Sequence, residues 1–414
     1  MIMSTATKER DSLKQAVGDL AIFGGKPAFK NPLHVGQPNI GDHKKFAERI
    51  SDILARRWLT NGGFYVSEFE ERIADIAGVE HCVAICNATI GLEIAIRALE
   101  LKGEVIVPSF TFIATAHALQ WQGITPIFCD IDRQSHCLDP EQVERLITPR
   151  TTGIIGVNLW GRSCEIGALT EIAARKGLKL LFDSAHAFAC TYKGSSIGSF
   201  GDAEVFSFHA TKFLNSMEGG AVVTNDPDLA QKIRLMRNFG FSDYDQTDSI
   251  GVNGKLNEVS AAMGLTNLES MAEFIAINRR HHKQYQDELD GLAGVTLLQY
   301  DEHERSNYQY VVLEIDEATT GVSRDQLMNI LHAENVLARR YFYPGCHRME
   351  PYRTLYADAP LSLPHTEFVA ARVLTLPTGQ GVTPEMISGV CETIRLVLDN
   401  ATEVCKLLDE RVPG

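Results

Sequence analysis

The sequence predicts an α/β protein whose large domain holds a mostly parallel, mixed sheet between helices and whose C-terminal part is a smaller α+β domain. Three observations support this prediction. With 414 residues, the chain exceeds the length over which one hydrophobic core usually keeps growing. Apolar runs alternate with helical segments over residues 81–226, as in parallel sheets covered by helices. Beyond about residue 285, the strand-like runs instead come in pairs.

The first predicted elements are two amphipathic helices. Apolar residues recur at helical spacing over residues 46–57 and again over 66–77, with a break at the glycine pair of WLTNGG. The strand HCVAIC follows and leads through NAT into a helix at 89–101. Asn87 or Thr89 can cap this helix, which leaves its first backbone N–H groups available to a ligand.

The middle of the chain continues this alternation. The expected strands are EVIVPSFTF, PIFCDID, TTGIIGVNLWG, LKLLFDSAHA, DAEVFSFHA and GGAVVTND, and the expected helices are ATAHALQWQG and residues 166–176. The runs before Ala187 are apolar without polar alternation, which is typical of parallel strands that are buried on both faces.

The last third of the chain begins with a long helical stretch at 257–290. It continues with VTLLQY, YQYVVLEID, a helix from Arg324, the segment VLARRYFYP and a final amphipathic helix at 384–398. The expected division is an N-terminal arm (1–37), a large domain (38–284) and a small C-terminal domain (285–414).

The charge pattern argues against nucleic acid or an anionic membrane as the main partner. The formal net charge is −14, and no basic stripe interrupts it. No window reaches the length of an apolar membrane span, and the N-terminal residues lack the apolar run of a signal peptide. We therefore expect a cytoplasmic enzyme. A phosphorylated small substrate stays compatible with this charge, because backbone N–H groups can hold an anion locally.

The nine cysteines indicate neither a disulfide framework nor a zinc ribbon. Their number is odd and no CxxC pair occurs. His81, Cys82 and Cys86 in HCVAIC are the best candidates for metal ligands, but on a strand they lie among apolar residues, so core packing is favoured over metal binding. No metal site is expected.

Four predicted strand ends carry polar or aromatic residues that suit chemistry. They are NAT at 87–89, SFTF at 109–112, DSAH at 183–186 and SFHATK at 207–212. Ligands of open α/β sheets bind outside the carboxyl ends of the strands, so these segments are the first candidates for a site.

Asp183 and Lys212 are the two charged residues at these ends. A carboxylate at the end of LKLLF requires a cation or hydrogen-bond donors, although an Asp that caps the next helix is an equally good interpretation. A lone lysine is usually solvated surface. Lys212 lies between Phe208 and Phe213, however, and a half-buried lysine has a lowered pKa and can form a Schiff base.

Together these residue types predict a pyridoxal phosphate (PLP) site. The cofactor needs a lysine amine, a carboxylate that keeps its pyridine nitrogen protonated, an aromatic stacking partner such as Phe112 and an anion site such as the helix start after NAT. Neither GxGxxG nor GxxxxGK[ST] occurs, so a nicotinamide or ATP enzyme is not expected.

The chain resembles the DegT/DnrJ/EryC1/StrS sugar aminotransferases, which are PLP enzymes of the aspartate-aminotransferase-like fold type I. The resemblance extends from about residue 38 to the last helix. It is carried by WLTNGGFYVSEFE, NATIGLEIAI, VPSFTFIATAHAL, FDSAHAFACTYKGSSIGSFGDAEVFSFHATK, MEGGAVVTND, GVNGKLNEVSAAMG and RRYFYPGCHRMEPY.

The resemblance implies roles for four residues around the cofactor ring. Lys212 would form the Schiff base and act as the base, and Asp183 would pair with the pyridine nitrogen. His186 would lie near the ring, and Phe112 would stack on it. Family members with His in place of the lysine are dehydratases, so Lys212 favours transamination.

The resemblance also implies a phosphate site and a dimer. Ala88, Thr89 and Ser207 would hold the phosphate, with Asn253 contributed by a neighbouring subunit, so that the protein would be an obligate homodimer. Many members have Gly-Thr in place of Ala88-Thr89, a change that a backbone N–H contact should tolerate.

The substrate implied by the resemblance is a nucleotide-linked 4-keto-6-deoxyhexose, with L-glutamate as amino donor. The chain looks most like the subgroup that aminates C4 of dTDP-4-keto-6-deoxyglucose, giving dTDP-4-amino-4,6-dideoxyglucose for deoxyaminosugar biosynthesis. Amination at C3 of a 3-keto sugar and a non-catalytic PLP-binding regulator are the alternatives. Candidate substrate contacts are Gly62, Gly63, Trp160, Tyr343 and His347. A tight turn for the glycines and ordinary packing for Trp160 and Tyr343 are equally good interpretations.

Overall fold

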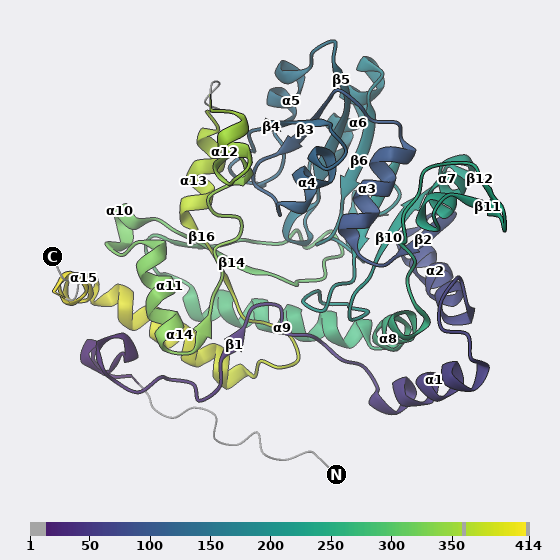
Figure 1. Ribbon diagram of the computed structural model, residues 1–414. Coiled ribbons are helices and arrows are strands. Elements are labelled where there is room, and N and C mark those ends of the chain that lie inside the picture. The colour runs from purple at the N-terminus through teal and green to yellow at the C-terminus, as the bar shows by residue number, and fades with distance from the viewer. Residues whose placement is uncertain (1–13, 358–361, 411–414) are drawn as a thin grey trace.

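The computed structural model describes residues 14–357 and 362–410, and its centre is a seven-stranded sheet (Figure 1). The strand order is β2-β10-β9-β6-β5-β3-β4. Only β10 runs against its neighbours; β2 and β9 both pair with it antiparallel, and the remaining pairs are parallel. The strands are β2 (His81–Ile85), β3 (Glu104–Pro108), β4 (Thr125–Cys129), β5 (Thr151–Val157), β6 (Lys179–Asp183), β9 (Ala203–Ser207) and β10 (Gly220–Thr224).

Helices cover both faces of this sheet, as the uninterrupted apolar strands require. The helices are α1 (His43–Arg56), α2 (Phe64–Ala77), α3 (Ala88–Ala98), α4 (Ala114–Gln120), α5 (Pro140–Leu146), α6 (Ile166–Lys176), α7 (Pro227–Arg237) and α8 (Glu258–Glu269). Helix α3 packs on β10, β9 and β6 beside α4 and α7, whereas α2 packs on β2 and β10 and against α8. Successive residues of β2 alternate between these two cores, with Val83 in one and Ala84 in the other.

The C-terminal part contains a second, three-stranded antiparallel sheet of order β13-β14-β16. The strands are β13 (Val295–Leu297), β14 (Val311–Ile315) and β16 (Val373–Leu376), and the helices are α9 (Met271–Leu289), α10 (Glu317–Thr320), α11 (Arg324–Ala333), α12 (Tyr352–Leu355), α13 (Pro364–Arg372), α14 (Pro384–Asp399) and α15 (Ala401–Asp409). Leu313 and Ile315 of β14 join a core with residues of α9, α11 and α14.

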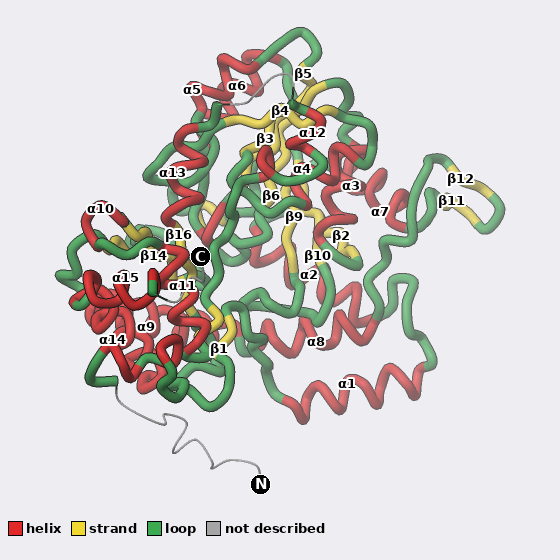
Figure 2. Tube along the Cα trace, turned by 60° about the vertical axis from the view of Figure 1, so that its left-hand side comes forward, coloured by secondary structure: helices red, strands yellow, loops and turns green. Residues whose placement is uncertain are grey.

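The described part of the N-terminal arm packs against this C-terminal part (Figure 2). Strand β1 (Leu33–His34) pairs in parallel with β15 (Val336–Leu337), and Leu20 and Phe29 enter the same core. The buried carboxylate of Glu334 accepts the N–H groups of Ala21 and Ala28, both at 2.6 Å, which attaches the arm to the end of α11. The expected domain boundaries stay a prediction.

The α/β class with a mostly parallel sheet is confirmed, but several elements differ in detail. The expected helix at 257–290 is two helices, because the chain leaves helical geometry at Ser270, between α8 and α9. Helices α5 and α7 were not predicted, although an Asp N-cap followed by Pro starts each of them. Helix α15 continues beyond the expected final helix.

Smaller elements complete the chain. They are the 3₁₀ turns Val17–Asp19, Ala21–Phe23, Leu159–Gly161 and Cys346–Arg348, the hairpin β7 (Thr191–Tyr192) to β8 (Ser195–Ser196), and the hairpin β11 (Phe241–Asp243) to β12 (Gln246–Thr247). The second hairpin projects from the body of the molecule (Figure 2). Among the described residues, none of the helices has the length and apolar character needed to cross a membrane.

Candidate active site

The four polar strand ends meet at one edge of the sheet. Because β2, β3, β6 and β9 run in the same direction, their carboxyl ends share this edge. Asp183 pairs in register with Val205, two residues before Ser207 at the end of β9. Gly220 lies in register between Ile85 and Ser207, so the start of α3 and the end of β9 flank the same glycine.

Lys212 lies in the loop that follows β9. The loop is held by Phe208, whose N–H donates to the carbonyl of Gly219 at 2.8 Å and whose carbonyl accepts the N–H of Ser216 at 2.8 Å. Phe208 and Phe213 are buried beside it. Burial lowers the pKa of Lys212 to about 8, although the charge of Asp183 opposes this shift. A lysine of this kind is a nucleophile near neutral pH.

Asp183 is buried and has two hydrogen-bond donors in addition to the charge of Lys212. The hydroxyl of Thr115 donates to its Oδ2 at 2.8 Å, and the N–H of Ala185 donates to Oδ1 at 3.2 Å. Burial raises the pKa of Asp183, whereas these donors and Lys212 lower it. A partly compensated carboxylate of this kind suits one further cationic or N–H partner.

His186 is a neutral, buried ring beside the lysine. Burial, with a smaller contribution from the charge of Lys212, holds the pKa of His186 well below its ordinary value. Its Nε2 is 2.9 Å from the hydroxyl of Tyr310, and its Nδ1 accepts the N–H of Trp160 at 3.4 Å. Sequence reasoning missed Thr115 and Tyr310, since each meets its partner across a long stretch of chain.

The start of α3 is a candidate anion site. The side chain of Asn87 caps the helix by accepting the N–H of Ile90 at 2.9 Å, which confirms one of the two expected caps. Among the described residues, no hydrogen bond engages the N–H groups of Ala88 and Thr89. Free N–H groups at a helix N-terminus suit a phosphate. Ser207 lies across Gly220 and is buried. Within the part of the chain that the structure describes, its hydroxyl accepts one hydrogen bond, a long one of 3.4 Å from the N–H of His209.

Phe112 differs from its neighbour Phe110 in exposure. Phe110 is fully buried, whereas 58% of Phe112 is exposed on the loop after β3. An exposed aromatic face at the same edge of the sheet as Asp183 is available to stack on a planar ligand. This donor set, together with the free N–H groups of α3, fits PLP.

Trp160 is packed inside the protein. Its side chain is fully buried, and its Nε1–H donates to Nδ1 of His136 at 3.2 Å. The ring stacks on Phe342 with a centroid distance of 5.5 Å. These contacts favour ordinary packing over a substrate contact as the role of Trp160.

Gly62 and Gly63 form the turn that starts α2. Gly62 has a φ of +67°, and a Cβ on Gly63 would lie 2.5 Å from Cδ of Glu258. The buried carboxylate of Glu258 accepts the N–H groups of Tyr65 and Val66 at 3.0 and 2.9 Å, so it caps α2. The geometry of the turn therefore explains why glycine occupies both positions, which favours the tight-turn interpretation over a substrate contact.

Tyr343 and His347 lie on the loop that follows β15, and they differ. Tyr343 is exposed, and Arg340 lies over its ring at 4.4 Å. His347 is buried, and its Nδ1 is 2.7 Å from the hydroxyl of Ser109, which also accepts the N–H of His347 at 3.0 Å. His347 therefore ties this loop to the segment that carries Phe112.

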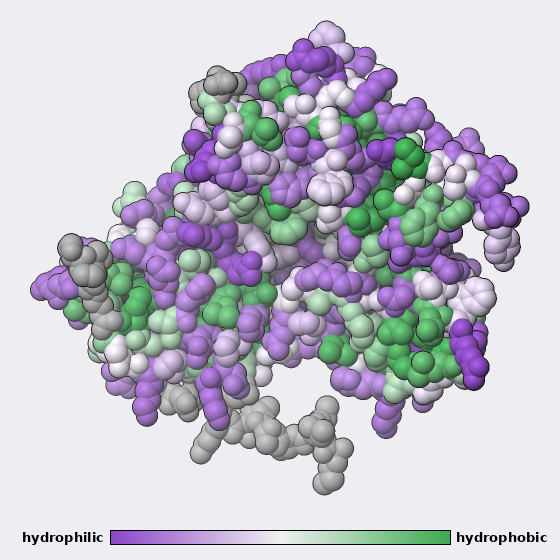
Figure 3. Space-filling view, viewed as in Figure 1, coloured by the Kyte–Doolittle hydropathy of each residue, from purple (hydrophilic) through white to green (hydrophobic). Residues whose placement is uncertain are grey.

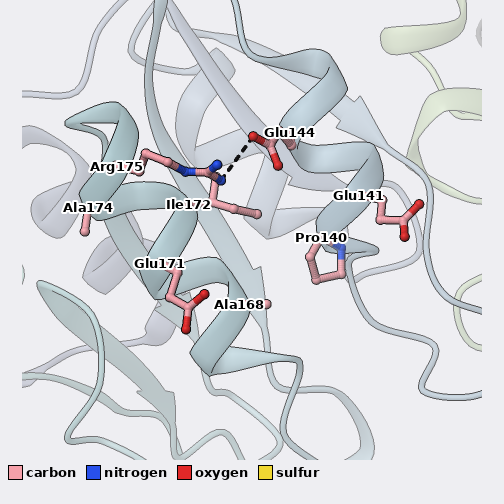
Figure 4. A pocket seen from close by; sticks show the side chains of 8 residues that line it. All are labelled: Pro140, Glu141, Glu144, Ala168, Glu171, Ile172, Ala174 and Arg175. Atoms are coloured by element: carbon pink, nitrogen blue, oxygen red, sulfur yellow. Dashed lines mark ion pairs between the residues drawn. The ribbon is translucent and has the colours of Figure 1, made fainter.

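Asn253 is exposed, and its backbone forms an isolated antiparallel β-bridge with Asn238 of the same chain. Its expected role in a neighbouring subunit's site stays a prediction. Over the described residues, no group of three or more His, Cys, Asp and Glu side chains is arranged to hold a metal ion. A cavity of about 680 Å³ between α5 and α6 contains an Arg175–Glu144 ion pair of 3.0 Å and none of the predicted site residues (Figure 4).

Comparison with known proteins identifies the family. Residues 41–395 match the DegT/DnrJ/EryC1/StrS aminotransferase family. The chain belongs to this family. It is 35% identical over 367 residues to dTDP-4-amino-4,6-dideoxy-D-glucose transaminase of Shigella dysenteriae, covering 89% of this chain and 99% of that protein. It is 34% identical to the Escherichia coli protein of the same name, covering 86% and 96%.

Solved structures agree with this assignment. The crystal structure of DesI in the presence of its TDP-sugar product superposes with a TM-score of 0.91 at 51% identity, covering 95% of this chain and all of that one. Helicobacter pylori PseC, an aminotransferase of pseudoaminic acid biosynthesis, gives 0.81 at 26% identity, covering 92% and 100%. The expected family, fold type I and enzyme class, a PLP-dependent nucleotide-sugar aminotransferase, are confirmed.

Proposed function

We propose that this protein transfers an amino group from L-glutamate to C4 of dTDP-4-keto-6-deoxyglucose, forming dTDP-4-amino-4,6-dideoxyglucose with PLP as cofactor. The chemistry rests on one observation above the others: a lysine with a pKa of about 8 and a buried Asp183 lie at the same sheet edge. The substrate assignment is supported by two relatives, from Shigella dysenteriae and Escherichia coli, that are named dTDP-4-amino-4,6-dideoxy-D-glucose transaminase.

The proposed cofactor contacts follow from the chemistry of each group. PLP supplies an aldehyde that accepts the amino group and a ring that withdraws electrons from the donor carbon. The amine of Lys212 would hold the cofactor and then move a proton between the donor carbon and the cofactor. Asp183 would keep a proton on the pyridine nitrogen. The phosphate would lie against the N–H groups of Ala88 and Thr89 and the hydroxyl of Ser207.

Two further residues would orient and enclose the ring. Phe112 has an exposed face for stacking, and His186 is neutral and fixed by Tyr310, so it would contact the ring side without adding charge. Tyr343 is the one proposed substrate contact with an exposed side chain. Gly62, Gly63, Trp160 and His347 would act through packing.

We also propose that the protein is a homodimer with shared sites. Large apolar side chains are exposed over α1, α2 and the β11–β12 hairpin, and apolar residues gather over α1 and α8 (Figure 3). These exposed residues are Leu54, Trp58, Leu59, Phe64, Phe239, Phe241 and Tyr244. A surface this apolar is typical of an interface. Asn253 follows the hairpin, which suits its proposed contact with a partner's phosphate. A cytoplasmic location stays an expectation.

The variant Lys212→Ala tests the catalytic assignment. We expect it to fold and bind pyridoxamine phosphate (PMP) but to lose transamination, because no amine remains to hold the cofactor or move the proton. Lys232→Ala, at an exposed ion pair on α7, is the matched control and should keep full activity. Normal turnover by the Lys212 variant would refute the assignment.

Product analysis tests the substrate. Incubation with dTDP-4-keto-6-deoxyglucose, PLP and glutamate should yield a C4 amine by NMR. A C3 amine from a 3-keto sugar would favour the regiochemical alternative. If the visible absorbance of the PLP form is unchanged by any amino donor, the protein is instead a non-catalytic PLP-binding regulator.

A further inference from the structure

The segment that leads from the N-terminal arm into the large domain contacts the chain on both sides of Lys212. A Cβ on Gly36 would lie 2.9 Å from Cβ of Thr211, the residue that precedes the lysine. The side-chain amide of Asn39 donates to the carbonyl of Phe213, the residue that follows the lysine, at 2.9 Å. This segment therefore borders the lysine from both directions along the chain.

Asn39 is buried, and its side chain uses both of its polar atoms. The nitrogen Nδ2 donates to Phe213, and the oxygen Oδ1 accepts the N–H of Gln380 at 2.9 Å. The backbone carbonyl of Asn39 accepts a bond from Nδ2 of Asn215 at 2.8 Å. A buried amide that is paired at both its nitrogen and its oxygen has one favourable orientation, so it fixes the segments that it joins.

The loop after β16 packs on the same segment. The side-chain oxygen of Gln380 accepts the N–H of Ile40 at 2.8 Å. A Cβ on Gly379 would lie 3.1 Å from Oδ1 of Asn39, so the backbone approaches this side chain closely. Asn39 thus joins the loop that carries Lys212 to a loop of the C-terminal part of the chain.

A second buried asparagine, Asn267 of α8, bonds to the lysine-carrying loop farther from the lysine. Its Nδ2 donates to the carbonyl of Asn215 at 2.7 Å, and its Oδ1 accepts the N–H of Gly41 at 2.8 Å. Both asparagine side chains therefore donate to one carbonyl of this loop and accept one N–H. They differ in position, because Asn39 holds the residue next to Lys212, whereas Asn267 holds a residue farther along the loop.

The amine of Lys212 depends on such support. It is buried and interacts with the charge of Asp183. A lysine side chain is long and flexible, so the place of its amine depends on where its backbone is held. The reaction of an amine with an aldehyde requires a narrow geometry, and a misplacement of about 1 Å can slow a reaction about a hundredfold.

We propose that Asn39 is a positioning residue for Lys212. Its amide would hold the backbone beside the lysine so that the amine meets the aldehyde of the cofactor. Asn39 would act through Phe213 and would contact neither the cofactor nor the substrate. The proposal rests on the function proposed above, in which Lys212 holds PLP.

The rate at which PLP attaches to the full-length, cofactor-free protein tests this proposal. Visible absorbance follows the rate, and peptide mass spectrometry after borohydride reduction identifies the modified residue. We expect Asn39→Ala to slow the attachment about tenfold or more, because the amine is held less well against the aldehyde. The midpoint pH for acetylation of Lys212 should also rise from about 8 toward 10.5, since a looser loop admits water to the amine.

Asn267→Ala is the matched control. It loses the same number of buried side-chain bonds as Asn39→Ala, so the urea midpoint of unfolding should fall about as far in both variants. The rate of PLP attachment and the acetylation midpoint of Lys212 should nevertheless stay close to the wild-type values in Asn267→Ala. These two measurements separate the positioning of the lysine from general support of the loop.

Gly36→Ala tests the other side of the lysine and serves if Asn39→Ala does not fold. The added Cβ would meet Thr211 at 2.9 Å, so the attachment of PLP should slow. Gly123→Ala is the control for this variant. Gly123 has a φ of +73°, close to the +76° of Gly36, and no atom lies within 4 Å of the added Cβ. It therefore carries the same backbone strain and should attach PLP at the wild-type rate.

Three results would overturn the proposal. They are a wild-type rate of attachment in Asn39→Ala, an equal loss of rate in Asn39→Ala and Asn267→Ala, or, if Asn39→Ala does not fold, a wild-type rate in Gly36→Ala. Failure of the proposed function is a separate outcome, because attachment of PLP to a residue other than Lys212 in the wild type refutes that function before any variant is compared. If the Asn39 results hold but the keto-sugar is not aminated, the positioning assignment stands and the substrate assignment fails.

Discussion

The lowered pKa of Lys212 predicts an unusual reactivity of its amine in the cofactor-free protein. At about pH 7.5, a pKa of about 8 leaves about a quarter of the amine neutral, whereas the ordinary value of 10.5 would leave about 0.1%. The neutral amine is the nucleophile. Lys212 should therefore react about two hundredfold faster at this pH than a lysine with the ordinary pKa, if the two amines are otherwise alike.

Trace labelling with acetic anhydride over a series of pH values measures this. The extent of acetylation at Lys212 is read by peptide mass spectrometry, with a short lysine peptide in the same tube as reference. We expect the Lys212 rate to rise about tenfold per pH unit at low pH and to level off above about pH 8. The reference peptide should continue to rise to about pH 10.

Asp183→Asn gives the profile a second test. The Asp183 carboxylate raises the pKa of Lys212, so its removal should move the midpoint to lower pH. Asp228→Asn, an exposed residue on α7, should leave the midpoint unchanged. A Lys212 profile that follows the reference peptide without a plateau would refute the burial argument. A midpoint that rises in Asp183→Asn would contradict the pairing of the two charges.

Three other variants probe the frame of the site. Glu258→Ala should lower the free energy of unfolding in urea by about 3 kcal/mol, because the N-terminus of α2 loses two charge-assisted hydrogen bonds. Glu258→Gln should recover part of this stability. An equal loss in the two variants would contradict the role of Glu258 as a cap. Gly220→Ala places a Cβ 2.8 Å from the N atom of Ala88, so the affinity for PLP should fall. Gly18→Ala is the control and should leave this affinity unchanged, because no atom lies within 4 Å of the added Cβ. Phe112→Ala should change the free energy of unfolding of the cofactor-free protein by less than about 0.5 kcal/mol, since the ring is exposed. The same variant should bind PLP several-fold more weakly, and an unchanged affinity would exclude stacking.

Much of the fold could be predicted because local periodicity determines it. Helix α6 has the predicted bounds, and each strand of the large sheet overlaps a predicted apolar run, with β4 beginning one residue before its run. The reversed direction of β10 could not be predicted, because an apolar run carries no signal for the direction of its pairing. The break at Ser270 was also missed, since the helical periodicity continues across it.

Chain distance explains what could not be predicted at the site. Lys212 and Asp183 were identified because each interrupts an apolar context with a charge, which is visible locally. Thr115 meets Asp183 across 68 residues, and Tyr310 meets His186 across 124, so neither contact has a local signature. The candidate substrate contacts Trp160 and His347 were chosen from their motifs, and the structure buries both.

The sequence by itself determined the candidate residues for the chemistry, because a lysine, a carboxylate and an aromatic residue at strand ends are recognisable from residue type and periodicity alone. Only the tertiary structure decided how those groups are tuned and what adjoins them. Burial shifts the pKa of Lys212, and the contact between Ser109 and His347 brings the segment after β15 beside the segment that carries Phe112. Both depend on segments that are distant in the chain and meet only when it folds.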